Sequence, residues 1–344
     1  MPKPSVKTRF LIISDTHGHT PATTSADDDL ISPSVDWLRV PTGFRHPLPK
    51  ADVVLHCGDL TTATIPGEYE ATFRLLRSLD APLKLVIAGN HDIALDEKTW
   101  GSIRHAPRHF RTEALEIIED AKEDGVQYLT EGSYTFDLAN GAVFPLYVSQ
   151  YTPEYGQWGF QYTTGHDFNI PPGVDVAMTH GPPHKVLDEA GVPGQGTPIN
   201  HAGCPDLFSA IERARPRIHC FGHIHEGWGA YHAKWRNGAR AGEAPATAEA
   251  CIDAEASEMS ERLRNLKPLT RAFPPPTEEQ ARRLVELSRN KGYYIDYTGS
   301  DGTAAGEQTL FLNAAIQDIR GRPTQLPFIV DMLLHEKGHG SRLA

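Results

Sequence analysis

Five short runs of apolar residues divide this chain, and a polar segment begins where each run ends. The runs occupy residues 9–14, 52–57, 83–88, 174–179 and 217–221. The first run is continuous rather than alternating, which is typical of strands that are buried on both faces of a sheet. Helical spacing of apolar residues follows the second and third runs, at residues 68–79 and 112–124. The pattern therefore predicts an α/β fold.

Two long segments do not share this regular pattern. Residues 19–50 hold Thr, Asp, Pro and Gly without clear periodicity and are predicted to form a long loop. From about residue 235 the composition shifts to Ala, Glu, Arg and Pro, and residues 246–266 and 277–290 have the pattern of surface helices. We expect one domain over residues 1–344, with a variable loop at 19–50 and a helical insertion at 236–304.

Composition and charge narrow the class of protein. The 344 residues are 39% hydrophobic and 22% charged, which is typical of a globular protein with a sizeable core. The formal net charge of −11 argues against a stable nucleic-acid partner, although bound divalent cations would still permit an anionic substrate. The four cysteines are too sparse for a disulfide framework. With no apolar stretch near the ~18 residues of a membrane span, we expect a cytoplasmic protein without a membrane partner.

Side chains of metal-ligand type follow all five apolar runs. In open α/β sheets, ligands bind at the carboxyl ends of the strands. Oxygen and nitrogen ligands without thiolates suit divalent Mn, Fe, Zn or Co. The seven candidate ligands are Asp15, His17, Asp59, Asn90, His180, His223 and His225. Because one metal needs only three or four protein ligands, this set indicates two metal ions, with Asp59 as the natural bridge.

The third strand end, Gly89-Asn90-His91-Asp92, also holds the candidate catalytic residues. Two metals about 3.5–4 Å apart polarise a phosphoryl group and produce hydroxide at neutral pH, but a leaving alkoxide still needs a proton. His91 is placed to act as the general acid, and Asp92 to orient it. The alternative is that His91 only donates a hydrogen bond to the phosphate. Gly89 is expected to let the backbone turn sharply.

An aromatic stretch at residues 151–162 allows two interpretations. Packing in the core is the simpler one. The alternative is an aromatic lip that stacks a nucleobase, for which Trp158 and Phe160 are the candidates. Asn200 and His201, in the Gly/Pro-rich loop after the fourth run, are candidates for the lining of the same substrate pocket.

The order of the strand-end blocks resembles that of calcineurin-like metallophosphoesterases. The blocks that carry this resemblance are Asp15-Thr16-His17, Gly58-Asp59, Gly89-Asn90-His91-Asp92, His180-Gly181 and Gly222-His223-Ile224-His225. A narrower resemblance points to the metallophosphoesterase-domain-containing branch, also called UPF0046. Its residues are Thr179-His180-Gly181-Pro182-Pro183, Leu187-Asp188, Gly203-Cys204, residues 221–229 and Leu312-Asn313-Ala314-Ala315. The resemblance covers roughly residues 8–235 and 305–332.

This resemblance implies a four-layer α/β/β/α sandwich, in which two mixed β-sheets are flanked by helices and the metals lie between strand ends. One metal would bind Asp15, His17, Asp59 and His225, and the other would bind Asp59, Asn90, His180 and His223. Manganese is the favoured metal, and Asn90 and His91 would contact the phosphate.

The branch is associated with phosphodiesterase activity, including activity on cyclic nucleotides. The resemblance therefore implies a hydrolase of small phosphodiesters that uses a metal-bridging hydroxide. One alternative is a phosphomonoesterase that acts on a phosphorylated metabolite or protein. The other is a weakly catalytic protein-binding scaffold, for which the 236–304 insertion would offer the partner surface.

The zinc-protease pattern HExxH also occurs, at residues 335–339. That pattern requires two histidines on one face of a stable helix and a third ligand beyond it. Gly338 weakens such a helix, so we predict that this segment is not a zinc site.

Overall fold

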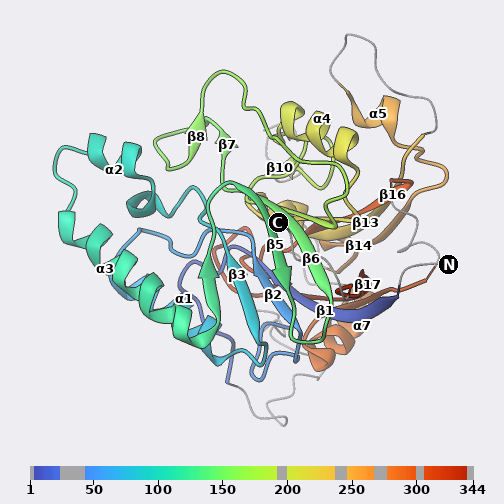
Figure 1. Ribbon diagram of the computed structural model, residues 1–344, viewed down its shortest axis with the longest axis horizontal. Coiled ribbons are helices and arrows are strands. Elements are labelled where there is room, and N and C mark those ends of the chain that lie inside the picture. Colours follow the sequence, from blue (N-terminus) through green and yellow to red (C-terminus); the bar gives the residue numbers. More distant parts are fainter. Residues whose placement is uncertain are drawn as a thin grey trace.

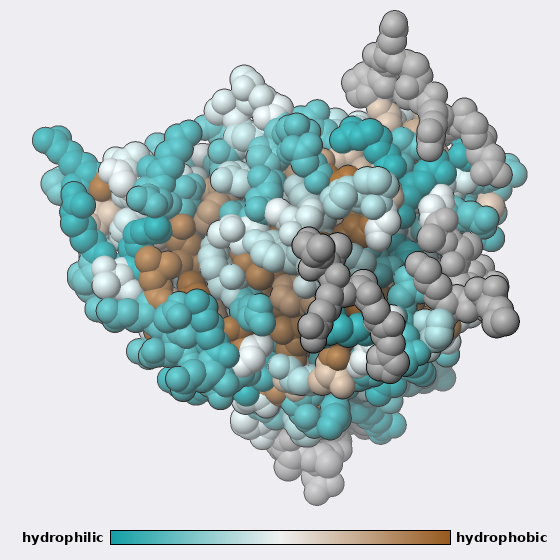
Figure 2. All heavy atoms as spheres, in the orientation of Figure 1, coloured by the Kyte–Doolittle hydropathy of each residue, from teal (hydrophilic) through white to brown (hydrophobic). Residues whose placement is uncertain are grey.

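Two large β-sheets pack face to face in the computed structural model, and helices cover their outer faces (Figure 1). The structure describes residues 4–23, 43–191, 200–236, 246–266, 277–299 and 306–338. This arrangement confirms the expected α/β fold of two mixed sheets flanked by helices. Figure 2 shows that one face of the molecule is largely hydrophilic, with apolar residues gathered near its centre.

The first sheet has six strands in the order β15-β17-β1-β2-β3-β4. Neighbouring strands from β1 to β4 are parallel, whereas β17 runs antiparallel to β1. Two helices, α1 and α3, cover its outer face, where Val54 and Val86 pack with Phe73 and Ile118. The bounds are β1 (Ser5–Ile13), β2 (Val53–His56), α1 (Pro66–Ser78), β3 (Leu83–Val86), α3 (Arg108–Asp120), β4 (Val126–Tyr128), β15 (Tyr293–Tyr297) and β17 (Phe328–His335).

The second sheet has seven strands in the order β14-β13-β16-β12-β9-β6-β5. The central strands β16, β12, β9 and β6 are parallel, and antiparallel strands flank them on both sides. Helix α4 covers the outer face, where Phe208 packs with Phe221 and Phe311. The bounds are β5 (Gly132–Asp137), β6 (Val143–Ser149), β9 (Val176–Thr179), α4 (Pro205–Ala214), β12 (Ile218–Phe221), β13 (Gly229–Lys234), β14 (Glu258–Arg262) and β16 (Gln308–Asn313).

The main core lies between the two sheets. Leu55 and Leu85 of the first sheet belong to the same buried cluster as Val176, Cys220 and Leu312 of the second. The alternate residues of the central strands face the outer helices, so these strands are buried on both faces. This burial is the physical reason why their sequences are rich in apolar residues.

The remaining elements are two small sheets and further helices. Strands β7 and β8 form a two-stranded sheet, as do β10 and β11. The bounds are η2 (Ile93–Leu95), α2 (Glu97–Ser102), η3 (Ala121–Asp124), β7 (Thr152–Pro153), β8 (Gln161–Tyr162), β10 (Glu189–Ala190), β11 (Asn200–His201), η4 (His225–Gly227), α5 (Ala248–Cys251), α6 (Leu263–Leu266) and α7 (Glu278–Asn290). In the described residues, no helix has both the length and the apolar character needed to cross a membrane.

The segment expected to be a helical insertion is partly β-structure. Helix α7 confirms the second predicted helix, and a Thr277 capping box begins it. The helix expected at residues 246–266 is wrong, because strand β14 lies there between the short helices α5 and α6. Strands β14 and β15 add an edge strand to each sheet. An edge strand needs no continuous apolar run, so its sequence carries little β-signal.

Some sequence predictions fall outside the described residues. Residues 24–42 of the expected loop are among them, as are residues 237–245, 267–276 and 300–304 of the expected insertion. The single-domain organisation and the partner surface stay predictions. In the HExxH segment, His335 ends strand β17 and pairs with Ser5, so it does not begin a helix, and His339 lies outside the described residues.

Candidate metal centre

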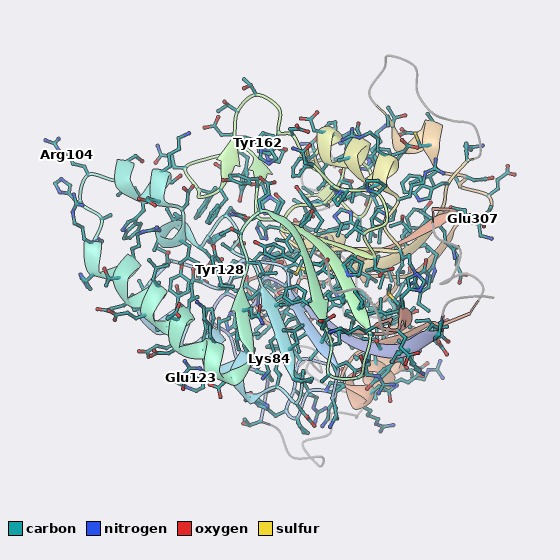
Figure 3. The ribbon with its side chains drawn as sticks, viewed as in Figure 1. Lys84, Arg104, Glu123, Tyr128, Tyr162 and Glu307 are labelled. Atoms are coloured by element: carbon teal, nitrogen blue, oxygen red, sulfur yellow. The ribbon has the colours of Figure 1, made fainter. Side chains whose placement is uncertain are left out.

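The carboxyl ends of strands from both sheets meet at one edge of the molecule. His180 follows β9 in the second sheet, and its Nδ1 lies 3.0 Å from the carbonyl oxygen of Cys57, which follows β2 in the first. The backbone N–H of His223, after β12, donates to both carboxylate oxygens of Asp15, after β1, at 3.1 and 3.0 Å. Lys84, at the start of β3, marks the opposite end of the first sheet (Figure 3). The predicted strand ends are thus brought together.

Four of the candidate ligands have a left-handed backbone. Their φ angles are 51° for Asp15, 46° for His17, 53° for Asp59 and 69° for His223. Such φ values cost about 1–3 kcal/mol each in residues other than glycine, and they cluster at functional sites. Backbone hydrogen bonds hold this geometry, since Asp15 N–H donates to the Gly58 carbonyl at 2.9 Å and His17 N–H donates to the Asp59 carbonyl at 3.0 Å.

The candidate ligands form two adjoining groups. Asp15, His17 and His225 place their ligand atoms within 4.8 Å of one another, and so do Asp59, His180 and His223. Asp59 lies between the groups, with Oδ1 3.4 Å from His180 Nε2 and Oδ2 3.6 Å from His17 Nε2. This is the position that a bridging carboxylate requires.

The hydrogen bonds of the histidines decide which ring nitrogen is free. The Nδ1 atoms of His17, His91 and His180 lie 2.8, 2.8 and 3.0 Å from the carbonyl oxygens of Thr61, Thr62 and Cys57. Because a carbonyl oxygen only accepts, each Nδ1 carries the proton, and each Nε2 of a neutral ring presents a lone pair. Carbonyl partners of this kind commonly orient histidine ligands of metals.

The donor atoms in the second group fit a cation. His180 Nε2 lies 2.8 Å from Asn90 Oδ1, and neither atom has a proton to place between them once His180 Nδ1 is protonated. His17 Nε2, also buried, has no hydrogen-bond partner among the described residues. A divalent cation would accept these lone pairs, so the residues present fit the predicted metal ions.

Burial and neighbouring charges shift the pKa values of the candidate ligands. Burial, followed by the charges of Asp15 and Asp92, raises the pKa of Asp59 well above its usual value. Burial lowers the pKa of His17 to about 3 and also lowers the pKa of His180. A metal ligand needs a neutral imidazole, which burial favours for His17 and His180, and a cation bound beside Asp59 would favour its ionised carboxylate.

Asp92 does not orient His91, so that part of the sequence interpretation is wrong. The Asp92 carboxylate is buried and accepts hydrogen bonds from the backbone N–H groups of Gly89, Leu60 and Thr61 at 2.8, 3.0 and 3.0 Å. Successive side chains in this turn point in different directions, which directs Asp92 beneath the loops that follow β2 and β3. It holds those loops together. Burial raises the pKa of Asp92 to about 7, although the backbone hydrogen bonds oppose this shift.

His91 faces the same space as the ligands. Its ring centroid is 4.8 Å from that of His17, and its ligand atom lies within 4.8 Å of those of His17 and Asp59. The carbonyl of Thr62 therefore has the orienting function that the sequence assigned to Asp92. Thr62 was missed because a backbone carbonyl leaves no residue-type signal in the sequence.

The aromatic stretch divides between core and site. Phe160 is 5% exposed and packs in the core with Tyr151, so its assignment to a substrate lip is wrong. Trp158 lies on His91 with the ring centroids 4.1 Å apart. Tyr155, which sequence reasoning missed, is 55% exposed, and its ring centroid is 5.3 Å from that of His223. The signal that could have indicated an exposed side chain was its position beside Gly156, in a loop flanked by Pro and Gly.

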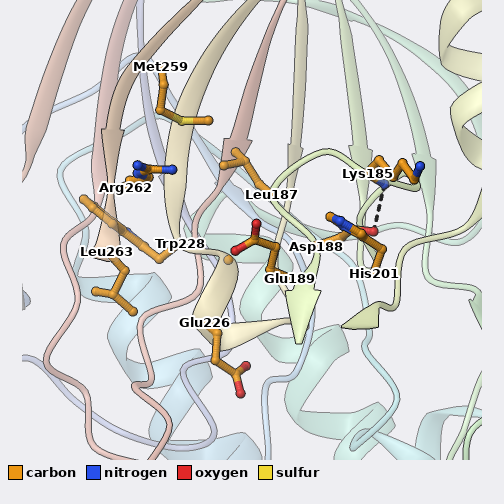
Figure 4. Close-up of a pocket in the computed structure, with 11 residues that line it drawn as sticks. Lys185, Leu187, Asp188, Glu189, His201, Glu226, Trp228, Met259, Arg262 and Leu263 are labelled. Carbon is orange, nitrogen blue, oxygen red and sulfur yellow. Dashed lines mark hydrogen bonds and ion pairs between the residues drawn. The ribbon is translucent and has the colours of Figure 1, made fainter. Parts of the chain in front are cut away.

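The predicted pocket residues Asn200 and His201 lie in β11, outside the ligand groups. His201 Nδ1 is 2.7 Å from the buried carboxylate of Asp188, beside a cavity of about 130 Å³ (Figure 4). Glu226, the residue after His225, also lines this cavity. Asn200 is exposed and does not line it. A substrate role for either residue stays a prediction.

Gly89 is needed because other side chains lie very close to its backbone, and not because the backbone turns sharply there. A Cβ atom there would lie 2.3 Å from Asp59 Oδ1 and 2.6 Å from His180 Cε1, and its φ is not in the left-handed region. We expect Gly89→Ala to lose metal and about 1–3 kcal/mol of stability, because the added methyl displaces ligands from both sheets. Metal content by mass spectrometry and thermal unfolding measure the two effects.

Gly67→Ala is the matched control, since a Cβ at this helical position meets nothing within 4 Å. This variant should keep its metal and gain a little stability. Full metal content in Gly89→Ala would contradict the close-approach explanation.

Comparisons with known proteins agree with this geometry. A family profile described as "Calcineurin-like phosphoesterase" matches residues 8–227. Metallophosphoesterase domain-containing protein 1 of Homo sapiens is 32% identical over 235 residues, which are 66% of this chain and 64% of the human protein. A UPF0046 protein of Caenorhabditis elegans is 30% identical over 199 residues, which are 53% of this chain and 48% of the worm protein. The chain thus spans less than two thirds of the length of these curated relatives.

One solved structure with similarity to this chain is the purple acid phosphatase PPD1 from seeds of yellow lupin, Lupinus luteus. Its sequence identity is 14% and its TM-score is 0.35. The similarity covers 70% of this chain and 41% of the lupin chain.

Proposed function

Because the chain belongs to the calcineurin-like phosphoesterase family, we propose that it is a dinuclear, metal-dependent phosphodiesterase of small phosphodiesters, cyclic nucleotides among them. Family membership supports the broader activity, hydrolysis of a phosphoric ester. The observation that best supports two metals is the position of Asp59, whose two carboxylate oxygens face two different groups of ligand atoms.

The residues that would hold the metals are those predicted from the strand ends. Asp15, His17 and His225 would hold one ion, and Asn90, His180 and His223 the other, with Asp59 between them. Two divalent ions bound there would polarise the phosphoryl group and lower the pKa of water, the chemistry that such pairs supply to phosphoester hydrolysis.

His91 and Asn90 would act on the substrate itself. His91 keeps its Nδ1 proton on the Thr62 carbonyl, so its Nε2 is the atom directed at the substrate. In the protonated ring, Nε2 would donate its proton to the leaving oxygen. The Nδ2 atom of Asn90 is buried and has no partner among the described residues, and it would donate a hydrogen bond to a phosphoryl oxygen.

Tyr155 supports an organic ester with a planar ring. Its side chain is exposed beside His223, at the outer side of one ligand group. Stacking of a base on an aromatic side chain is worth about 1–3 kcal/mol. A cyclic nucleotide places a base within reach of its phosphodiester, so the proposed substrate class is consistent with an aromatic ring at this position.

A screen with added Mn²⁺ tests the proposed function. The substrates are bis-p-nitrophenyl phosphate, p-nitrophenyl phosphate, and 2′,3′- and 3′,5′-cyclic nucleotides, each measured before and after chelation. We expect faster turnover of the diesters than of the monoester, and loss of both activities on chelation. Preference for the monoester would favour a phosphomonoesterase, and no turnover of any ester would favour a protein-binding scaffold.

A further inference from the structure

The loop between β7 and β8, residues 154–160, lies directly on the third strand end. Its two ends are fastened to each other, because Thr152 N–H donates to the Phe160 carbonyl at 3.0 Å. Gly159 N–H donates to the carbonyl of Asn90 at 2.9 Å, and Phe160 N–H donates to the carboxylate of Asp96 at 2.8 Å. The loop is therefore attached to the segment that carries His91.

Trp158 is held between His91 and its own loop. The indole and imidazole centroids are 4.1 Å apart, and the ring planes are inclined by 32°. A Cβ atom added to Gly156 would lie 3.2 Å from the indole Nε1, so the loop backbone at Gly156 also lies close to the indole. The indole is half-buried and contacts His91, and its predicted role of stacking a nucleobase stays a prediction.

The surroundings of His91 restrict its ring from three directions. The indole of Trp158 covers it at 4.1 Å, the His17 ring meets it at 88° with a centroid distance of 4.8 Å, and the Thr62 carbonyl binds its Nδ1. Of these three contacts, only the indole is unconnected with the candidate metal ligands and is a side chain that substitution can remove. An imidazole that lost it would keep only the contacts with His17 and the Thr62 carbonyl, and its rotation would be less restricted.

We propose that Trp158 is the positioning residue for His91, and that it holds the imidazole in the orientation that directs Nε2 at the leaving oxygen. A general acid must lie within about 2.6–3.2 Å of the atom it protonates, so rotation of the ring removes the proton transfer without removing the substrate. This role rests on the proposed function. It predicts an effect on kcat rather than on KM.

Leaving-group dependence is the activity test. With cyclic nucleotides, whose leaving alkoxide needs a proton, Trp158→Ala should lower kcat by about 10-fold or more, as part of the 10²–10⁴-fold that a general acid supplies. With bis-p-nitrophenyl phosphate, whose leaving group is stable without a proton, kcat should change by less than about 3-fold. Trp158→Phe keeps a ring against His91 and should restore most of the activity. In a His91→Ala background, Trp158→Ala should cause no further loss on either substrate.

A second measurement needs neither metal nor turnover. In the metal-free protein, the ring current of the indole should shift the NMR proton resonances of the His91 imidazole. These resonances are identified by their absence from the spectrum of His91→Ala. These resonances should move toward ordinary histidine values in Trp158→Ala. Gln157→Ala, which alters an exposed neighbour in the same loop, should leave them unchanged.

The outcomes separate this role from the proposed function. Equal losses on both substrates, losses that add to those of His91→Ala, or unshifted His91 resonances in the wild type would each overturn the positioning role while the phosphodiesterase stands. Absence of turnover in the wild-type protein with Mn²⁺ would overturn the function and the positioning role together.

Discussion

Asp59→Asn is expected to lower kcat/KM for phosphodiesters by about 10³-fold or more. Asp59 faces both ligand groups, through Oδ1 toward His180 and Oδ2 toward His17. An asparagine replaces one of these oxygens by an NH₂ group, which has no lone pair for a metal. Mutation of a residue that only hydrogen-bonds to a metal ligand already lowers metal affinity or activity by about 10–100-fold. The loss of a bridging ligand should lower activity more.

The same substitution should not destabilise the metal-free protein. Burial and the nearby charges of Asp15 and Asp92 raise the pKa of Asp59, so the ionised carboxylate is unfavourable there. Asparagine removes that charge and keeps an oxygen for the His91 N–H, which Oδ1 accepts at 2.8 Å. We therefore expect an unchanged or higher thermal midpoint without metal, together with reduced metal content by mass spectrometry.

Asp175→Asn is the control for loss of a buried carboxylate away from the site. Asp175 lies just before β9, and its Oδ1 is 3.1 Å from Nη1 of Arg217. This variant is expected to retain its metals and its activity, with some loss of stability from the ion pair. Full turnover by Asp59→Asn with two metals bound would refute the bridging assignment.

His91→Ala is expected to have the second large effect, one that depends on the leaving group. Because His91 is predicted to protonate the leaving oxygen, kcat should fall by about 10²–10⁴-fold for cyclic nucleotides. The loss should be much smaller for p-nitrophenyl diesters, whose leaving group needs no proton. Both metals should remain, since the two ligand groups around Asp59 are complete without His91.

His91→Gln distinguishes proton transfer from hydrogen bonding. A glutamine side chain can donate a hydrogen bond to the phosphate, but it cannot transfer a proton at neutral pH. If it restores hydrolysis of cyclic nucleotides, His91 is a hydrogen-bond donor and not an acid. A drop in metal content in His91→Ala would instead assign His91 to the third possible ligand group, with His17 and Asp59.

Residue type and strand position could be predicted from the sequence because both are local properties. The run at residues 83–88 is mostly apolar since both faces of β3 are buried, and the polar residues after it lie at the carboxyl end of a parallel strand. The same reasoning located Asp15, Asp59 and His180, and the structure brings all of them to one edge. The signal failed for β14 and β15, because edge strands need no buried pattern.

The direction of each side chain was decided only by tertiary structure. Asp92 and His91 are neighbours in the chain, yet one fastens two loops and the other faces the ligands. Trp158 and Phe160 are two residues apart, but Phe160 is buried in the core whereas Trp158 covers His91. Nothing in the local pattern distinguishes these alternatives.

Long-range contacts are the physical reason for that limit. The orientation of His180 is set by the carbonyl of Cys57, 123 residues away, and that of Asp15 by the N–H of His223, 208 residues away. Such partners exist only after the two sheets have packed and their strand ends have met. The sequence by itself therefore determined which chemical groups stand at the strand ends, and the packing of the sheets decided how Asp59 lies between the ligand groups and how Trp158 meets His91.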